Sequence, residues 1–433
     1  KRLRTSSLVE VLRQAFEAVE DQRNGPNKRY ELADVALSAF AVFFTQSPSF
    51  LAYQRSLQVR QGRCNLESIF GVGEVPSDNQ IRNVLDRVSW ARVNPVYREI
   101  FLRIEASGLL ERRRSYGKTL LIALDGMQFF SSGAISCAQC QVRRTARGKE
   151  RYEHRVLMVV QVVPGEETVL PLGLEFIQPQ DGVEKQDCEL RAAERWLDQV
   201  GEFYARRQVT LLGDDLYSHV PFCQKVWERG IHFLFTCKAE SHPHLYQTLA
   251  FLEANGGVER LEKRYWNGRH GELWRYRFVN EVALSAEGTF WVNWLELTIV
   301  HEESGEVLYR NAWVTRWEVN HHTVEGLAQA GRSRWKVENE NINILKTKGY
   351  HVEHNFGHGK HNLANLLLAL NVLAFLFHTV AQLVDEVYQS LRRVLGSRRR
   401  FFQHIEALLQ YFVFESWEAL LEFMYTRLEL NTS

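Results

Sequence analysis

The pattern of hydrophobic and polar positions divides the chain into helical and strand-rich segments. Over residues 1–116, apolar residues recur every three or four positions, as in "LADVALSAFAVFF", which predicts a helical region. From residue 117, short apolar runs such as "TLLIALDG" and "RVLMVVQVVPG" are interrupted by helical patterns. Their order over residues 117–250 is β-β-β-α-β-α-β, which predicts an α/β layer.

The pattern changes again in the second half of the chain. Residues 251–315 hold β-branched and aromatic runs such as "TFWVNWLELTIV", separated by glycine and charged turns, which predicts an antiparallel β insertion. Residues 316–376 return to helical spacing, and residues 377–433 continue it as a separate C-terminal region. We therefore expect an α/β fold: a mixed-sheet core interrupted by a β insertion, with helical N- and C-terminal regions.

The longest apolar run, Leu363–Val380, approaches the length of a membrane span. It contains Asn365, Asn371 and His378, which favour a buried core helix over a lipid-facing one. The first residues, "KRLRTSSLVEVLRQAFEAVED", have the spacing of an amphipathic helix rather than of a signal peptide. These patterns predict a soluble cytoplasmic protein without a membrane partner.

Charge gives only local signals. The chain has 433 residues and a net charge of +1, so it lacks the overall basic excess of many nucleic-acid-binding proteins. Basic clusters do occur, as in "RRTARGKER", which holds Arg143, Arg144 and Arg147, and in "SRRR" at residues 397–400. They are candidate phosphate contacts, with solvated loops as the alternative. The short helix predicted after "VPSD" is a candidate DNA-recognition helix in the N-terminal region.

Carboxylates follow two of the predicted strands directly. Asp125 ends the run "LIALD", and Asp214 and Asp215 end "TLLGDD". Ligands of α/β sheets bind at such strand ends. Together with a glutamate on a later helix, two such aspartates could hold Mg²⁺ or Mn²⁺, and a pair of these ions can clamp a phosphodiester.

The segment "RWKVENENINILK" offers two glutamates for that role. At about 100° per residue, Glu338 falls on one helix face with Trp335, Ile342 and Leu345, so it is expected in an apolar stripe. Glu340 falls on the other side and is expected to be solvated. A carboxylate in an apolar stripe needs a metal or a partner such as Arg334, four residues earlier, and the geometry leaves both open.

These motifs resemble a known family. "LIALDG", "LLGDDLYS" and "GRSRWKVENENINILKTKGYHVEHNFGHG" are similar to the DDE transposases of bacterial insertion sequences, in particular to the subgroup with a β-strand insertion and a Tyr-Arg-Glu-Lys signature. The resemblance covers residues 117–376. It implies an RNase H-like core, two Mg²⁺ or Mn²⁺ ions, and cut-and-paste transposition by cleavage of transposon ends and strand transfer. The implied catalytic and metal-binding triad is Asp125, Asp214 and Glu338.

Position by position, the resemblance favours Asp214 over Asp215 because Tyr217 then falls where the family has an aromatic residue. It assigns DNA contact to Arg334. The family's tyrosine would stand at Gly331 and its lysine at Leu345, beside which Lys346 is the candidate phosphate contact. The register that makes Glu340 catalytic fits the signature less well.

The family also implies an aromatic residue of the insertion that holds a flipped base. The candidates are Trp291, Trp294 and Trp313, of which Trp291 is the predicted DNA contact, and filling of the β core is the alternative for each.

The cysteines suggest a second kind of site. Cys137 and Cys140 form a C-x2-C pair, and His154 and Cys188 follow downstream, so a structural zinc site is possible, with buried free thiols as the alternative. His354, His358 and His361 form a separate histidine cluster before the long apolar helix.

The predicted partner is double-stranded DNA, both transposon ends and target. A homodimer is expected on DNA because two ends must be held together, in the nucleoid-associated cytoplasm of a bacterium. Two alternatives stay open at this point: a metal-dependent nuclease on the same core, and an inactive DNA-binding relative.

Overall fold

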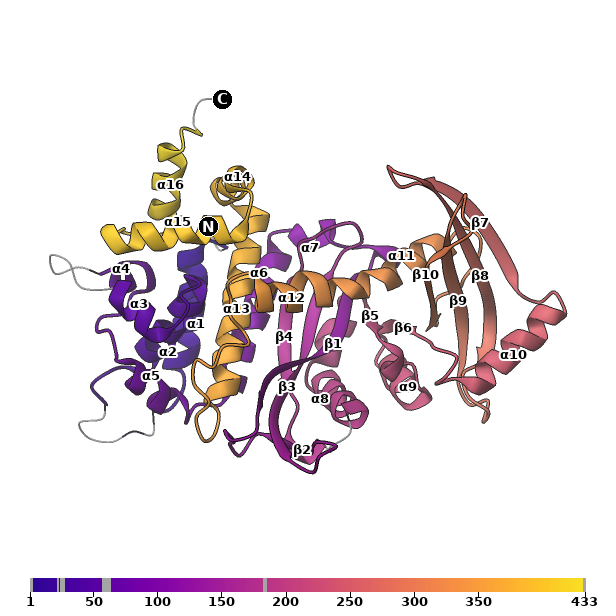
Figure 1. Cartoon of the computed structure of the whole chain (residues 1–433), viewed down its shortest axis with the longest axis horizontal. Helices are drawn as coiled ribbons and strands as arrows, with labels where there is room; N and C mark the ends of the chain where they lie inside the picture. Colours follow the sequence, from indigo (N-terminus) through magenta and orange to yellow (C-terminus); the bar gives the residue numbers. More distant parts are fainter. Residues whose placement is uncertain (1–2, 22, 24–27, 57–63, 182–184, 431–433) are drawn as a thin grey trace.

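The structure is a computed structural model that describes residues 3–21, 23, 28–56, 64–181 and 185–430. It is elongated, with a helical region at one end, a sheet in the middle, and a β-rich end formed by a later part of the chain (Figure 1). The N- and C-terminal helices lie at the same end, so chain segments far apart in sequence share one core there (Figure 1).

The N-terminal region is helical, as its periodicity predicts. Its helices pack around α2, in which nearly every residue is buried. They are α1 (Thr5–Glu17), α2 (Leu32–Phe44), α3 (Phe50–Ser56), α4 (Asn65–Phe70), α5 (Asp78–Leu85), α6 (Asn94–Ala106) and α7 (Leu109–Arg112). The short helix α5 begins with a capping box between Ser77 and Gln80, which is the start signal seen in the sequence.

One ten-stranded mixed sheet runs through the described part of the chain, which confirms the α/β expectation. Its order is β2-β3-β1-β5-β6-β10-β9-β8-β7, with β4 paired to β3. β1 is antiparallel to β3 and parallel to β5, and β5 is parallel to β6. The strands are β1 (Leu120–Ser132), β2 (Gln141–Arg144), β3 (Glu150–Val162), β4 (Leu170–Phe176), β5 (Val209–Gly213), β6 (His232–Thr236), β7 (Glu259–Trp266), β8 (Gly271–Ala283), β9 (Trp291–His301) and β10 (Val307–Thr315).

The β insertion extends this sheet instead of forming a sheet of its own. Its last strand, β10, pairs antiparallel with β6, so β7–β10 add an antiparallel half to the central strands. Helices α8 (Lys185–Ala205), α9 (Val220–Glu228) and α10 (Pro243–Ala254) connect the strands. The predicted boundary at 250/251 falls inside α10, because this helix leads directly into β7.

The prediction of a single regular helix around Glu338 is wrong. Here α11 (Val324–Arg332) passes into a 3₁₀ turn (Ser333–Trp335), a π-helix (Val337–Ile342) and then α12 (Asn343–Thr347). Since 3₁₀ and π turns do not advance by 100° per residue, the predicted apolar face breaks up. Val337, Asn341 and Leu345 are fully buried, whereas Trp335 is 59% exposed and Glu338 is also exposed.

The long apolar helix α13 (Leu363–Val384) is a core helix, as predicted. It is long and apolar enough to cross a membrane, but 83% of its most apolar window is buried inside the protein. Two of its polar residues bond to Tyr350: Asn371 donates to the Tyr350 carbonyl at 2.7 Å, and His378 shares a 2.6 Å hydrogen bond with the Tyr350 hydroxyl. The predicted boundary at 376/377 falls inside this helix, which is followed by α14 (Glu386–Leu395), α15 (Arg398–Tyr411) and α16 (Trp417–Arg427).

Candidate active site and metal centre

Asp125 lies in β1, and Asp214 directly follows β5, the strand that pairs parallel with β1. β1 pairs with β5 from Leu120↔Val209 to Ala123↔Leu212. Two residues further along this register, Asp125 stands opposite Asp214, and neighbouring strands are about 4.8 Å apart. The sequence suggested that Asp125 ends its strand. In the structure β1 continues to Ser132 while pairing with β3.

The environment of Asp125 holds more negative than positive charge. Burial raises the pKa of this carboxyl, and the charges of Asp214 and Glu338 raise it further, while Arg334 opposes the shift. Arg334 donates from Nη1 to Oδ2 of Asp125 at 3.1 Å. Arg334 is thus the cation, and Asp214 and Glu338 are the anions, whose charges act most strongly on Asp125.

The two adjacent aspartates have different partners. Asp215 accepts hydrogen bonds from the Lys238 backbone N–H at 2.6 Å and from the Ser241 hydroxyl, so it anchors the loop after β6. Asp214 caps the short turn that follows β5 by accepting from the Leu216 N–H at 3.0 Å. Its charge reaches Asp125, and its second carboxylate oxygen is free of any hydrogen bond to the described residues.

The two glutamates of the π-helix face different surroundings. The charge of Glu338 acts on Asp125. Glu340 instead lines a separate groove with Asn339 and Asn343. The alternative in which Glu338 pairs with Arg334 does not hold within the described chain, since the ion pair of Arg334 is with Asp125.

Gly331 explains why the expected tyrosine of the signature is missing. A Cβ at this position would lie 2.6 Å from Nε1 of Trp313, which is only 1% exposed. No larger side chain fits in this helix unless the core around Trp313 moves. The Trp313 ring therefore occupies the space that a side chain at position 331 would need.

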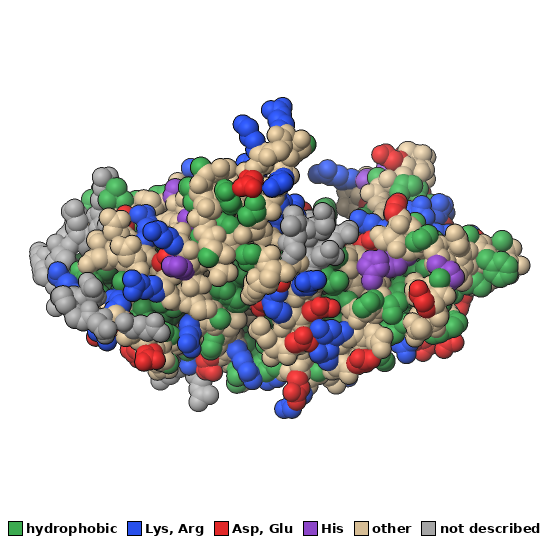
Figure 2. Space-filling view, turned by 90° about the horizontal axis from the view of Figure 1, so that it is seen from below, with side chains coloured by type: hydrophobic (Ala, Val, Ile, Leu, Met, Phe, Trp, Pro, Cys, Tyr) green, Lys and Arg blue, Asp and Glu red, His purple; other side chains and the backbone are tan. Residues whose placement is uncertain are grey.

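The other predicted DNA contacts are dispersed. Lys346 is 3.0 Å from Glu353 in an ion pair. Arg143 lies 3.5 Å from Glu153, whereas Arg144 and Arg147 are exposed on the β2–β3 hairpin. On the face in Figure 2, Lys and Arg side chains stand among Asp and Glu side chains and form no patch of a single sign.

Of the three candidate tryptophans, only one presents its ring to a ligand. Trp291 is 50% exposed at the start of β9, while Trp294 and Trp313 are 2% and 1% exposed and fill the core. The core-filling alternative therefore describes Trp294 and Trp313.

A groove of about 1330 Å³ lies between the π-helix and the C-terminal helices. Sequence reasoning singled out "SRRR" but not this groove, because its lining comes from distant parts of the chain. Five cationic side chains line it, against three glutamates; the cations are Lys348, Arg392, Arg393, Arg398 and Arg399, and the glutamates are Glu167, Glu340 and Glu406.

Two of these arginines are half-buried and have no acidic partner among the described residues. Nε and Nη1 of Arg392 are buried and have no hydrogen-bond partner among the described residues. Arg398 donates to the Tyr350 hydroxyl at 3.0 Å, and within the same residues neither guanidinium forms an ion pair with a carboxylate. Buried cations of this kind are typical of sites that bind an anion.

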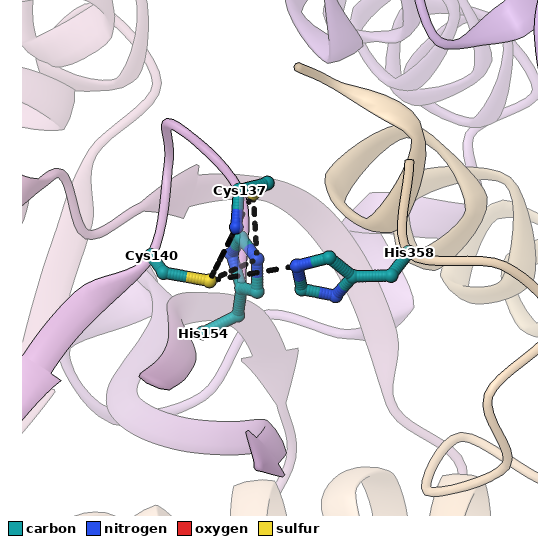
Figure 3. A group of neighbouring side chains, drawn as sticks. All are labelled: Cys137, Cys140, His154 and His358. Carbon is teal, nitrogen blue, oxygen red and sulfur yellow. Dashed lines mark hydrogen bonds between the residues drawn. The ribbon is translucent and has the colours of Figure 1, made fainter. Parts of the chain in front are cut away.

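Cys137, Cys140, His154 and His358 converge on one point (Figure 3). Within the described chain this is the one group of three or more His, Cys, Asp or Glu residues whose ligand atoms all lie within 4.8 Å of one another. The cysteines come from the β1–β2 loop, His154 from β3, and His358 from the loop before α13. This cluster could bind a metal ion.

The cluster changes the ligand set expected from the sequence. The side chain of Cys188 lies outside the described part of the structure, and His358 is the fourth member instead. His358 belongs to the histidine-rich sequence "GHGKHN". Cys140 and His358 are 218 residues apart, so only the fold shows that they meet. His354 is exposed, and neither it nor His361 belongs to the cluster.

No protein-family model matches the chain, and no curated protein matches it significantly.

Proposed function

We propose that this protein is a DNA transposase that cleaves transposon ends and joins them to target DNA by metal-dependent phosphoryl transfer. The observation that carries the proposal is that Asp214 directly follows β5, the parallel neighbour of the strand that holds Asp125, and that the charges of Asp214 and Glu338 both act on Asp125. The resemblance of the motifs around these residues to DDE transposases supplies the reaction class.

The fold supports the same proposal. We assign β4-β3-β1-β5-β6 and the helices between them to an RNase H-like core, with β7–β10 as the insertion that precedes the acidic helix. In this assignment the first two carboxylates stand on the central strands, and the third comes from a helix that follows the insertion.

The residues fit a pair of hard divalent cations. Asp125, Asp214 and Glu338 offer the carboxylate oxygens that Mg²⁺ and Mn²⁺ prefer, and Arg334 alone does not balance their charge. When bound, two such ions would activate the attacking oxygen and stabilise the leaving oxygen of a phosphodiester. A π-helix at Glu338 agrees with the frequent occurrence of π turns at functional sites.

The chain's own residues supply orientation and charge. Arg334 fixes one carboxylate oxygen of Asp125, and capping of the turn after β5 fixes one of Asp214. The Gly126 backbone N–H also donates to the Asp125 carboxyl, whereas Oδ2 of Asp214 has no hydrogen-bond partner among the described residues. Arg334 acts as a positioning residue because it bonds to Asp125. This role explains its place in the site without a direct contact to a DNA phosphate.

We place the DNA backbone in the arginine-lined groove, which borders the π-helix through Asn339, Glu340 and Asn343. Its unpaired guanidiniums offer charge-assisted hydrogen bonds to phosphates. Its amide side chains, such as Gln389 and Gln403, add uncharged donors. The exposed ring of Trp291 is the candidate for stacking on an extruded base.

A strand-transfer assay tests the proposal. The purified chain is mixed with Mn²⁺, a plasmid target, and a duplex that carries the DNA end flanking its gene, pre-cleaved to expose a 3′-hydroxyl. A transposase joins this duplex to the plasmid. Hydrolysis without joined product would support a nuclease instead, and DNA binding without either product would support an inactive relative.

A further inference from the structure

We propose that Cys137, Cys140, His154 and His358 form a closed, structural zinc site that cross-links the β1–β3 part of the sheet to the chain segment following the Glu338 helix. This site is separate from the carboxylates and does not depend on the proposed function.

The interatomic distances match a tetrahedral zinc site. A zinc ion with Zn–S bonds of about 2.3 Å and Zn–N bonds of about 2.05 Å requires S···S distances of about 3.8 Å and S···N distances of about 3.5 Å. The two sulfurs are 3.8 Å apart. His154 Nε2 is 3.4 Å from each sulfur, and His358 Nε2 is 3.5 Å from the Cys140 sulfur. These four distances therefore agree with one tetrahedron.

The chemistry of the donors selects zinc. Two thiolates and two imidazoles are the ligands of structural zinc sites, and four protein ligands leave no open position for a substrate. Two thiolates also neutralise a divalent ion, which suits a cluster in which three of the four residues are buried. The sulfur separation excludes a disulfide, whose S–S bond is about 2.05 Å.

The surrounding backbone is arranged for thiolates. The N–H of Gln139 donates to the Cys137 sulfur, and the N–H of Cys137 donates to the Cys140 sulfur, both at 3.4 Å. Such outer contacts orient metal ligands and stabilise their charge.

The site joins segments that also contact each other directly. The backbone of Ala138 donates to the Lys360 carbonyl at 3.3 Å, and the ring of His358 packs 4.3 Å from that of Phe130. The loop that holds His358 connects α12 to α13. A metal here would fix one end of the segment that carries Glu338 against β1 and β3.

Metal analysis of the full-length chain, purified without chelator, tests the inference. We expect about one zinc per chain, and after exchange we expect the visible absorption of tetrahedral Co²⁺ bound to thiolates. Cys137→Ser and His358→Gln should lose the metal and lower the melting temperature by about 5–10 °C. His358→Cys, which keeps a ligand, should retain zinc.

Two matched variants control the experiment. His354→Gln changes an exposed histidine four residues from His358, and Cys64→Ser changes a buried cysteine outside the cluster; both should keep the full zinc content. A wild-type chain that binds neither zinc nor Co²⁺, or a Cys137→Ser chain that folds and keeps its zinc, would overturn the proposal. If the ligand variants fail to fold, the cobalt spectrum of the wild-type chain still decides it.

Discussion

Arg334 Nη1 lies 3.1 Å from Oδ2 of Asp125, although the two residues are 209 positions apart in sequence. This contact ties the segment that carries Glu338 to the central strand of the sheet. It also joins the two halves of the proposed active site, which the β insertion separates along the chain.

Asp125→Asn should abolish cleavage while stabilising the fold at neutral pH. The pKa of Asp125 is raised above its ordinary value of 3.8, mainly by burial. The protonated carboxyl is the more favourable form in the folded protein; it predominates at pH values below 3.8 and is lost as the pH rises through the folded-state pKa. The ionised carboxylate therefore destabilises the protein at pH 7. We expect activity to fall by at least roughly 1,000-fold and the melting temperature to rise at pH 7 but not at pH 4.

Mn²⁺ provides the companion measurement. It should raise the melting temperature of the wild-type chain and have a smaller effect on Asp125→Asn, because the variant lacks a ligand. An equal shift in both chains would contradict metal binding at Asp125.

Glu338→Gln and Glu340→Gln should differ sharply. Only Glu338 acts electrostatically on Asp125, whereas Glu340 lines the groove. We expect Glu338→Gln to lose cleavage by at least roughly 1,000-fold and Glu340→Gln to stay within about tenfold of wild type. Because Glu340 lines the groove in which we place the DNA, its variant should bind DNA at least as tightly as wild type in gel-shift assays. If only the Glu340 variant lost cleavage, Glu340 would be the catalytic glutamate instead of Glu338.

Replacing two groove arginines should weaken DNA binding in a salt-dependent way. The double variant Arg393→Gln with Arg399→Gln removes two cations that line the groove. Each phosphate contact contributes about 0.9 to the slope of log affinity against log salt concentration, so the slope should fall by about 1.8.

The control for that measurement removes the same charge elsewhere. Arg206 and Arg264 have side chains that are 73% and 77% exposed, and neither lines the groove. Their double glutamine variant should leave the slope unchanged, and an equal loss in both double variants would indicate a non-specific charge effect.

Gly331→Ala should destabilise the protein although alanine is the better helix former. Helix propensity alone predicts a gain of about 0.5–1 kcal/mol. The added Cβ would meet the buried ring of Trp313, so we expect a net loss of about 1–3 kcal/mol in the free energy of unfolding. Gly173→Ala in β4, where no atom lies within 4 Å of the added Cβ, should be close to neutral in the same denaturant titration.

Local patterns in the sequence determined the main elements. Apolar spacing predicted the helical N-terminal region, the mixed α/β layer, the β insertion and the buried helix α13, because burial selects residues with the period of the element they form. The position of Asp214 directly after a strand was visible for the same reason.

Only the tertiary structure decided which residues meet. The π-helix overturned the predicted face of Glu338, since local sequence does not encode a change in helical pitch that tertiary packing stabilises. The pairing of Arg334 with Asp125 and the contact of His358 with Cys140 join positions that lie 209 and 218 residues apart, and the contact between Trp313 and Gly331 joins a strand to the helix that follows it. Such contacts leave no periodic signal in the sequence, because they depend on how the sheet brings distant segments together.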